Sequence, residues 1–254
     1  MSGKANNHIT ENLVNFYAEV ALAGGLNAGT IAGIPYVSNQ AGEWPRYLLG
    51  SKALTGEKVK HIAAAMSGGR VPPFWIMESA PGKNTGKLLS ASGIRLINYW
   101  TGMYQEASNI RSTVQPCHNC ELRRLSENSE IELWVELVNE VVMTSSQLDT
   151  QLFRKLLYSG KFHFYGLWKG DDFLSATLIF VHNQTAGLYF VATRQAYQGK
   201  GFGTAIAGYA MHEVKAAGAE RFVLHSTREG LKLYQNSGFM TMNRYDIYWL
   251  LGKR

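Results

Sequence analysis

The first half of the chain alternates between helical and extended runs of apolar residues. One apolar stripe recurs every three or four positions and consists of Leu13, Phe16, Tyr17, Val20 and Ala21. This spacing predicts a helix that begins near Thr10 and ends at Gly24. A second stripe predicts a helix through Val59–Met66. Short apolar runs predict strands at 31–38, 44–50, 74–77 and 97–104, with a solvated hairpin loop at 81–87.

The second half has a more regular pattern, in which helical periods and alternating apolar residues follow one another closely. Two helices are expected, followed by three strands, at 131–142, 152–157, 162–167, 173–182 and 187–193. A helix, a strand, a short helix and a last strand complete the order, at 204–217, 221–226, 229–235 and from 239. A meander of antiparallel strands followed by one right-handed crossover predicts an α+β fold with a mixed sheet.

A polar segment separates the two halves. Residues 105–130 are rich in Asn, Ser and Glu and contain Pro116, which suits an exposed connector better than a core element. We therefore expect a smaller N-terminal α+β domain at 1–115, a linker at 116–128 and a second domain at 129–254.

Composition restricts the class of protein before any motif is considered. The 254 residues are 46% hydrophobic and 17% charged, which is ordinary for a globular chain. No run approaches the ~20 apolar residues of a membrane span, and the polar N-terminus lacks the apolar core of a secretory signal. The formal net charge of +6 is not gathered into a Lys/Arg run that would track nucleic acid. We expect a soluble, cytoplasmic protein with neither a membrane nor a nucleic acid as partner.

The most informative segment is Gln198-Gly199-Lys200-Gly201-Phe202-Gly203-Thr204, between a predicted strand and a predicted helix. Three glycines at alternate positions let the backbone turn tightly and leave its N–H groups uncovered. The following helix adds unpaired N–H groups and the positive end of its dipole. Together these features predict a cradle for a phosphate or pyrophosphate, with the charge of Lys200 at its rim.

Other glycine-loop families fit this segment poorly. A dinucleotide-binding fingerprint would need a glycine in place of Thr204, and the preceding strands form a hairpin rather than a βαβ unit. A Walker loop would need a Lys-Ser/Thr pair after a four-residue gap, and a kinase loop would lie between antiparallel strands. A plain glycine-rich turn is the remaining alternative.

The motif Gln198-x-x-Gly201-x-Gly203 resembles the acetyl-CoA pyrophosphate signature Gln/Arg-x-x-Gly-x-Gly/Ala of the GNAT superfamily of N-acetyltransferases. Residues 231–239, a short helical segment that carries Tyr234 and ends in Gly-Phe, are similar to a later segment of that family. The order of elements from about 131 to 251 matches as well. The resemblance implies a GNAT-like mixed sheet with flanking helices, and it allows the first half to be a degenerate copy of the same fold.

The resemblance also implies a co-substrate and the residues that bind it. Acetyl-CoA would lie where the strands at 187–193 and 221–226 splay apart, and a backbone N–H of the first strand would polarise the thioester carbonyl. The implied binding residues are Val191, Ala192, Thr193, Gln198, Gly199, Lys200, Gly201, Phe202, Gly203, Thr204 and Thr227. The sequence departs from the family at Gln195, where proline is common, at Thr227, where asparagine is common, and at Gly230, where alanine is usual.

The implied reaction is direct attack on acetyl-CoA by a primary amine of a small molecule or peptide. Tyr234 is the candidate proton donor to the departing thiolate, because a phenol held within reach is a better donor than water. No Asp or Glu lies in the two splayed strands, so His225, at the end of the second strand, is the candidate base, and His182 is a poorer one. A packed aromatic side chain and a surface histidine are the ordinary alternatives.

A cysteine motif lies in the polar connector between the two halves. Zinc needs four ligands and no second Cys/His pair matches Cys117-His118-Asn119-Cys120, so we expect no metal site and two free thiols, with a reversible disulfide as the alternative.

The first half lacks the glycine loop and is expected to form a wall of the acceptor site or an interface. The exposed aromatic candidates for such a wall are Tyr36, Trp44, Trp75 and Trp100.

Two functions therefore stay open. The favoured one is an acetyl-CoA-dependent N-acetyltransferase, and the alternative is a non-catalytic acyl-CoA-binding or regulatory protein that keeps the cradle without turnover. The sequence leaves open the identity of the acceptor amine and the oligomeric state, a homodimer included.

Overall fold

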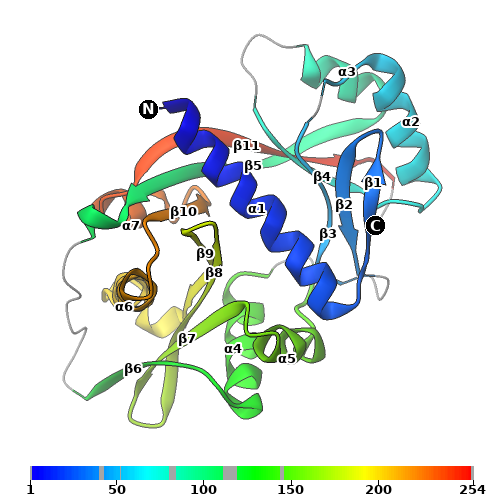
Figure 1. Cartoon of the computed structure of the whole chain (residues 1–254). Helices are drawn as coiled ribbons and strands as arrows, with labels where there is room; N and C mark the ends of the chain where they lie inside the picture. The colour runs from blue at the N-terminus through cyan, green and yellow to red at the C-terminus, as the bar shows by residue number, and fades with distance from the viewer. Residues whose placement is uncertain are drawn as a thin grey trace.

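The protein is built around a single mixed β-sheet with helices on both faces, which confirms the predicted fold class (Figure 1). The computed structural model describes residues 2–39, 43–51, 53–79, 84–110, 119–143 and 146–252. Among these residues the sheet has 11 strands, in the order β1-β2-β3-β4-β11-β5-β10-β9-β8-β7-β6. Both halves of the chain contribute to it.

The first half forms three helices and five strands. Their bounds are α1 Ser2–Gly24, β1 Asn27–Ile31, β2 Ile34–Ser38, β3 Arg46–Leu49, α2 Gly56–Ser67, β4 Phe74–Glu78, α3 Thr85–Ala91 and β5 Ile94–Glu106. Helix α1 begins earlier than expected at Thr10, and it ends where Gly25 adopts a positive φ of 66°.

The second half contains the remaining elements. They are a 3₁₀ turn at Ala107–Asn109, β6 Cys120–Arg124, α4 Asn128–Val141, α5 Thr150–Tyr158, β7 Phe162–Lys169, β8 Asp172–His182, β9 Thr185–Thr193, a 3₁₀ turn at Gln195–Tyr197, α6 Phe202–Ala216, β10 Arg221–Ser226, α7 Leu231–Asn236 and β11 Met240–Leu250. The predicted order of these elements from α4 onward is confirmed.

Two segments differ from the sequence-based expectation. A solvated hairpin loop was expected at 81–87, but helix α3 begins within this range, at Thr85, and buries Leu89 against the sheet. Within the expected linker at 116–128, Cys120–Arg124 forms β6, the edge strand that pairs with β7. A polar strand at a sheet edge has one solvated side and therefore lacks the apolar alternation that identifies an inner strand.

The two halves exchange their last strands at the centre of the sheet. Strand β11, from the end of the chain, lies between β4 and β5, while β5 lies between β11 and β10. Only two neighbouring pairs among the described strands are parallel, β3 with β4 and β9 with β10, and each is joined through a helix, α2 or α6. This repeated arrangement agrees with a first half that is a copy of the second.

The helices divide between the two faces of the sheet. Helices α1, α4 and α5 pack on one face, and alternate residues such as Ile76 and Val223 point toward them. Helices α2 and α3 cover the opposite face over β4, where Trp75 is buried, and α6 covers that face over β10, where Leu224 is buried. Helix α1 crosses the sheet diagonally and contacts strands of both halves (Figure 1).

Strand β5 pairs with both β10 and β11, and Gly102 on β5 tests how closely the side chains of these strands pack. A Cβ atom on Gly102 would lie 2.2 Å from Asn243 Oδ1 and 2.7 Å from Tyr245 Cε2. We expect Gly102→Ala to lower the free energy of unfolding by ~1–3 kcal/mol, because these side chains must move. Urea denaturation followed by circular dichroism measures this change.

Gly86→Ala is the matched control. Gly86 lies in the first turn of α3, and a Cβ there would meet nothing within 4 Å. Alanine favours the helix over glycine by up to ~1 kcal/mol, so this variant should be as stable as the parent or slightly more stable. Equal unfolding free energies for the two variants would contradict the close fit.

Candidate active site

Strands β9 and β10 part near their carboxyl ends, as expected. Their parallel pairing begins at Thr185 with Arg221 and ends at Leu188 with Leu224, although β9 continues to Thr193. The pairing of β9 with β8 shifts register beyond Tyr189. At this bulge Phe190 has a positive φ of 54°, in the left-handed region that non-glycine residues seldom adopt.

Aromatic packing holds the bulge in place. The Phe190 ring lies edge-on against Trp44, Trp134 and Phe153, with ring centroids 5.3–6.0 Å apart. Because these three rings come from the loop before β3 and from helices α4 and α5, the unusual conformation of β9 is fixed by tertiary contacts.

The glycine loop that follows β9 has the conformation of an open cradle. Gly199 and Gly201 have positive φ values of 73° and 87°, and a Cβ on either one would point into open space. Gly201 is the N-cap of α6, and no side chain caps the helix. The N–H groups of the first turn of α6 are therefore left for an anion.

Three residues tie the cradle to the end of β9. Gln198 Nε2 donates a hydrogen bond to Thr193 O at 3.0 Å, and a Cβ on Gly203 would lie 3.3 Å from Thr193 Oγ1. The Gln198 side chain therefore stabilises the loop by linking it to the end of β9. A larger residue at 203 would crowd the end of β9 and the start of α6.

Lys200 places a positive charge on the exposed side of the loop. Its Nζ donates to Ala196 O at 3.0 Å and lies 5.3 Å from the centroid of the Tyr197 ring. Both contacts keep the ammonium beside the glycines. The candidate residues Phe202 and Ala192 are buried, so only their backbone groups can meet a ligand, whereas Thr204 is exposed.

Tyr234 lies on α7, which borders the same region. A Cβ on Gly203 would be 3.4 Å from Leu233 Cδ1, so the neighbouring residue of α7 touches the start of α6. The Tyr234 ring packs edge-on against Phe239 at 5.9 Å, and its hydroxyl makes no hydrogen bond to a residue that the structure describes. Burial raises the pKa of Tyr234 well above its ordinary value of 10, which keeps the phenol protonated.

His225 lies at the end of β10 on the face that α1 covers. Its ring packs against Tyr245 at 4.4 Å and near Trp100 at 6.1 Å, and its Nε2 is buried without a hydrogen-bond partner. Burial lowers the pKa of His225 to about 3. The imidazole is therefore neutral at pH 7 but a weak base in this environment.

The other sequence candidates lie elsewhere or have structural contacts. His182 lies at the turn between β8 and β9, at the opposite end of β9 from the cradle, with Nε2 3.4 Å from Glu11. Thr227 Oγ1 accepts a hydrogen bond from Gly230 N–H at 3.3 Å just before α7. Trp44 and Trp75 are buried, at 3% and 0% exposure, so the expectation that they form an exposed wall is wrong.

Sequence reasoning missed the residues that surround His225. Asn243 from β11 has a buried Oδ1 without a partner, its Nδ2 donates to Tyr245 OH at 3.3 Å, and Gly102 of β5 leaves room for it. These residues come from strands that meet only through the exchange of β5 and β11. No local pattern could have revealed them.

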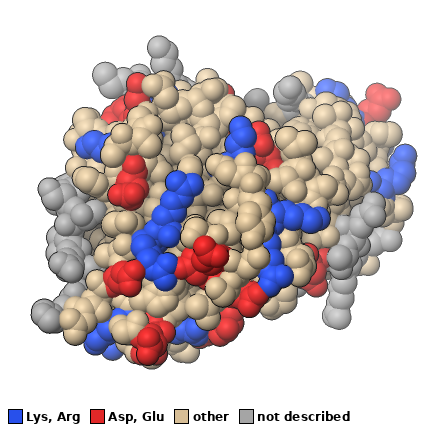
Figure 2. Space-filling view, turned by 60° about the horizontal axis from the view of Figure 1, so that its bottom comes forward, with Lys and Arg blue, Asp and Glu red and all other residues tan. Residues whose placement is uncertain are grey.

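The remaining expectations concern cysteines, metals and membranes. Cys120 is disulfide-bonded, so the expectation of a free thiol is wrong for this residue, and Cys117 lies outside the described residues. No group of three or more His, Cys, Asp or Glu side chains in the described part of the chain could hold a metal ion. No described helix is long and apolar enough to span a membrane. On the face in Figure 2, basic and acidic residues are interspersed.

Comparisons with known proteins agree with this geometry. Residues 130–239 match the acetyltransferase (GNAT) family. A GCN5-related N-acetyltransferase from Kribbella flavida has a similar fold, with a TM-score of 0.71 at 8% identity over 95% of this chain and 96% of that one. A tandem GNAT protein from the clavulanic acid biosynthesis pathway has a TM-score of 0.59 at 12% identity over 95% and 94%. No curated protein matches the sequence.

The match of residues 130–239 to the GNAT family agrees with the resemblance seen in the sequence and supports acyl transfer as the activity of this part of the chain. A protein of unknown function from Staphylococcus epidermidis also has this fold, with a TM-score of 0.64 at 12% identity over 89% of this chain and 94% of that one. The likeness to a tandem protein extends over both halves, which agrees with a degenerate first copy.

Two histidines with a buried ring nitrogen predict how stability depends on pH. Burial lowers the pKa of His225 to about 3 and that of His163 to about 4, below the value of 6.5 for an unfolded histidine. Between pH 6.5 and about 4 the unfolded chain binds protons that the folded chain does not, so stability falls as the pH falls. The slope is at most ~1.4 kcal/mol per pH unit for each group. Urea denaturation at pH 7 and pH 5 measures the difference.

His225→Gln should make this loss of stability smaller by ~1–2 kcal/mol, because one titrating group is removed. His212→Gln is the control, since His212 is exposed on α6. If both variants lose as much stability as the parent between pH 7 and pH 5, His225 is not buried in its neutral form.

Proposed function

We propose that this protein transfers an acetyl group from acetyl-CoA to a primary amine of a small molecule or peptide. The observation that carries the proposal is the uncapped start of α6 beside the divergent ends of β9 and β10. Gly199 and Gly201 leave backbone N–H groups open there, and Lys200 adds a positive charge. This donor set suits a pyrophosphate, which acetyl-CoA carries between its adenosine and pantetheine parts.

The end of β9 supplies the groups that would bind the rest of acetyl-CoA. Beyond Leu188 the strand has no partner on β10, so its backbone toward Thr193 is free to pair with the amides of the pantetheine arm. A backbone N–H near the Phe190 bulge would polarise the thioester carbonyl as charge develops on its oxygen. The aromatic packing around Phe190 holds this backbone in place before the substrate binds.

Tyr234 is proposed as the proton donor. When the neutral amine attacks the carbonyl carbon, the C–N bond forms, the C–S bond breaks and the thiolate takes a proton from the Tyr234 hydroxyl. The proton that the new amide nitrogen releases passes through water to the Tyr234 phenolate, which restores the donor. The raised pKa of Tyr234 ensures that this proton is present at neutral pH. Its hydroxyl is free of described protein partners and can therefore turn toward the sulfur.

His225 is proposed as a hydrogen-bond acceptor for the incoming amine rather than as a strong base. Its neutral imidazole has an unpartnered Nε2, which can accept a hydrogen bond from an amine. A group with a pKa of about 3 removes a proton from an ammonium group poorly. The ammonium group of the acceptor therefore loses its proton to water before the neutral amine attacks.

Because its lowered pKa makes His225 a weak base, one alternative function is supported. A protein with the same cradle and no effective base would bind acyl-CoA without turnover, as a regulatory protein would. Neither Thr185–Thr193 nor Arg221–Ser226 contains Asp or Glu. The test of Tyr234 below separates the alternatives, since only an enzyme has a rate that depends on the proton donor.

Tyr234→Phe should lower kcat at least tenfold and leave the Kd for acetyl-CoA unchanged, because the donor acts only on the leaving thiolate. Turnover is measured as release of the CoA thiol in the presence of a panel of primary amines. Tyr209→Phe is the control, since Tyr209 on α6 packs on Tyr165. An unchanged rate in Tyr234→Phe would remove this residue from the mechanism, and no release by the parent would favour the regulatory protein.

Lys200→Glu should weaken acetyl-CoA binding about tenfold or more, because it reverses the charge beside the phosphates. Gly203→Glu should abolish binding, since its side chain would occupy the start of α6. Titration calorimetry measures both Kd values, with Lys169→Glu as the control because Lys169 is exposed at the end of β7. Equal affinity in Lys200→Glu and Lys169→Glu would place the phosphates elsewhere.

A further inference from the structure

Two polar side chains flank Gly102 at the point where β10 leaves β9. His225 is the first residue of β10 beyond its last pair with β9. Gly102 of β5 pairs with His225 on one side and with Asn243 of β11 on the other. A Cβ on Gly102 would collide with Asn243 Oδ1, so the amide leans over Gly102 toward the strand that carries His225. His225 Nε2 and Asn243 Oδ1 are both buried and have no hydrogen-bond partner among the described residues.

The orientation of the Asn243 amide follows from a chain of hydrogen bonds that ends at Glu78. As a carboxylate, Glu78 can only accept hydrogen bonds. Thr10 Oγ1 donates to Glu78 Oε2 at 3.5 Å, so the Thr10 oxygen is left to accept from Tyr245 OH at 2.6 Å. The Tyr245 oxygen in turn accepts from Asn243 Nδ2 at 3.3 Å. The amide is thereby turned so that Oδ1, which is an acceptor, is the atom left over Gly102.

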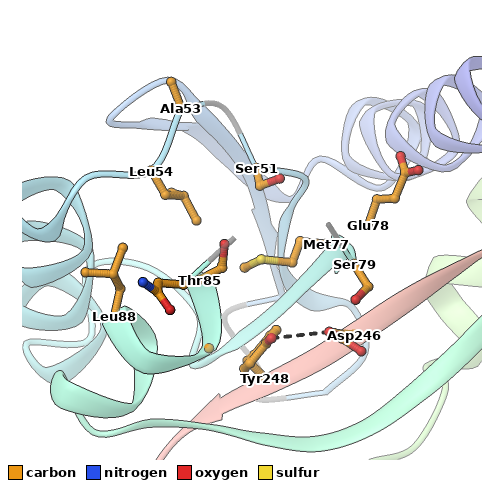
Figure 3. Close-up of a pocket in the computed structure, with 12 residues that line it drawn as sticks. Ser51, Ala53, Leu54, Met77, Glu78, Ser79, Thr85, Leu88, Asp246 and Tyr248 are labelled. Carbon is orange, nitrogen blue, oxygen red and sulfur yellow. Dashed lines mark hydrogen bonds between the residues drawn. The ribbon is translucent and has the colours of Figure 1, made fainter. Parts of the chain in front are cut away.

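Two further observations support this direction of the chain. In Figure 3 the Glu78 side chain points toward α1, the helix that carries Thr10, and away from the pocket that Thr85 and Tyr248 line. Burial raises the pKa of Tyr245 to about 12, so its hydroxyl keeps the proton that it donates at neutral pH. A carboxylate of the first half therefore determines which atom of Asn243 is available beside His225.

We propose that His225 Nε2 and Asn243 Oδ1 together hold the acceptor nitrogen, and that Asn243 makes the site specific for primary amines. This inference rests on the proposed function and names the class of amine that the site accepts. Glu78, Thr10 and Tyr245 are positioning residues, which act through the Asn243 amide.

The number of hydrogen-bond donors on the acceptor is the basis of this specificity. A neutral primary amine has two N–H groups, one for His225 Nε2 and one for Asn243 Oδ1, and its lone pair is left for the carbonyl carbon. A secondary amine has one N–H group and would leave one of these buried acceptors without a partner. His225 and Asn243 are half-buried residues, so an acceptor can approach them from solvent.

Selectivity between two amines tests the role of Asn243. The probes are the primary amine with the highest kcat/KM in the panel used for Tyr234→Phe and the N-methyl derivative of that amine. We expect the parent to favour the primary amine at least about tenfold in kcat/KM, because an unpaired buried acceptor disfavours the secondary amine. Asn243→Leu, which removes the acceptor at similar size, should reduce this preference to about threefold or less. Thermal unfolding checks that the variant is folded.

Glu78→Gln tests whether the carboxylate sets the orientation of the amide. A glutamine can donate to Thr10 Oγ1, which lets the chain reverse so that Tyr245 donates to Asn243 Oδ1 and Nδ2 is left facing the amine. This variant should lower kcat/KM for the primary amine about tenfold and leave the Kd for acetyl-CoA unchanged. Glu57→Gln, on the exposed first turn of α2, is the matched control and should react as the parent does.

A second substitution separates a positioning role of Glu78 from a merely structural one. Asn243→Asp presents only acceptor atoms, whichever way the chain runs. It should keep the preference for the primary amine, and adding Glu78→Gln to it should lower kcat/KM by less than about twofold. A structural role of Glu78 would give the same loss with and without Asn243→Asp.

The inference is overturned if the parent acetylates both probes equally well, or if folded Asn243→Leu keeps the preference of the parent. It is also overturned if Glu78→Gln reacts as the parent does, or loses as much activity in the presence of Asn243→Asp as alone. In each of these results the parent still releases CoA thiol, so the proposed function stands. No release by the parent with any amine of the panel overturns both.

Discussion

The structure depends on the antiparallel pairing of β5 with β11 at the centre of the sheet. Strand β11 pairs with β5 from Met240 to Leu250, and each strand also pairs with the other half, β5 with β10 and β11 with β4. Because the inner strand of each half comes from the other, neither half can complete its hydrogen-bond ladder alone. The two halves therefore share one sheet, although the sequence divides them at a polar segment.

This exchange carries residues of the first half into the proposed active site of the second. Trp100 of β5 lies beside His225, and Gly102 leaves room for Asn243. Helix α1 contributes from the same face, since Phe16 stacks on Tyr189 at 3.8 Å and Asn12 Oδ1 accepts a hydrogen bond from the Tyr189 hydroxyl. The first half thus supports β9 directly, through contacts that fix the strand before its bulge.

The two halves share the arrangement of a parallel strand pair joined through a helix, and they differ in the chemistry at corresponding places. Where the second half has an uncapped helix and a glycine loop, the first half has Thr55 as a cap and Glu57 in the first turn. Where β9 and β10 part, β3 and β4 remain joined at Gly50. Corresponding places in the two halves therefore differ in the groups that they offer to a ligand. The fold alone therefore does not determine what either half binds.

The sequence by itself determined the features that depend on neighbouring residues. The glycine cradle, the following helix and the order of elements from α4 to β11 could be predicted, because backbone conformation and apolar periodicity are local properties. Helix α3 and the polar edge strand β6 could not, since they are short and their patterns are weak. The surroundings of His225 and the lowered pKa of its imidazole were decided only by the tertiary structure. Each arises where strands far apart in the sequence become neighbours, and burial there changes the properties of groups that the sequence only lists.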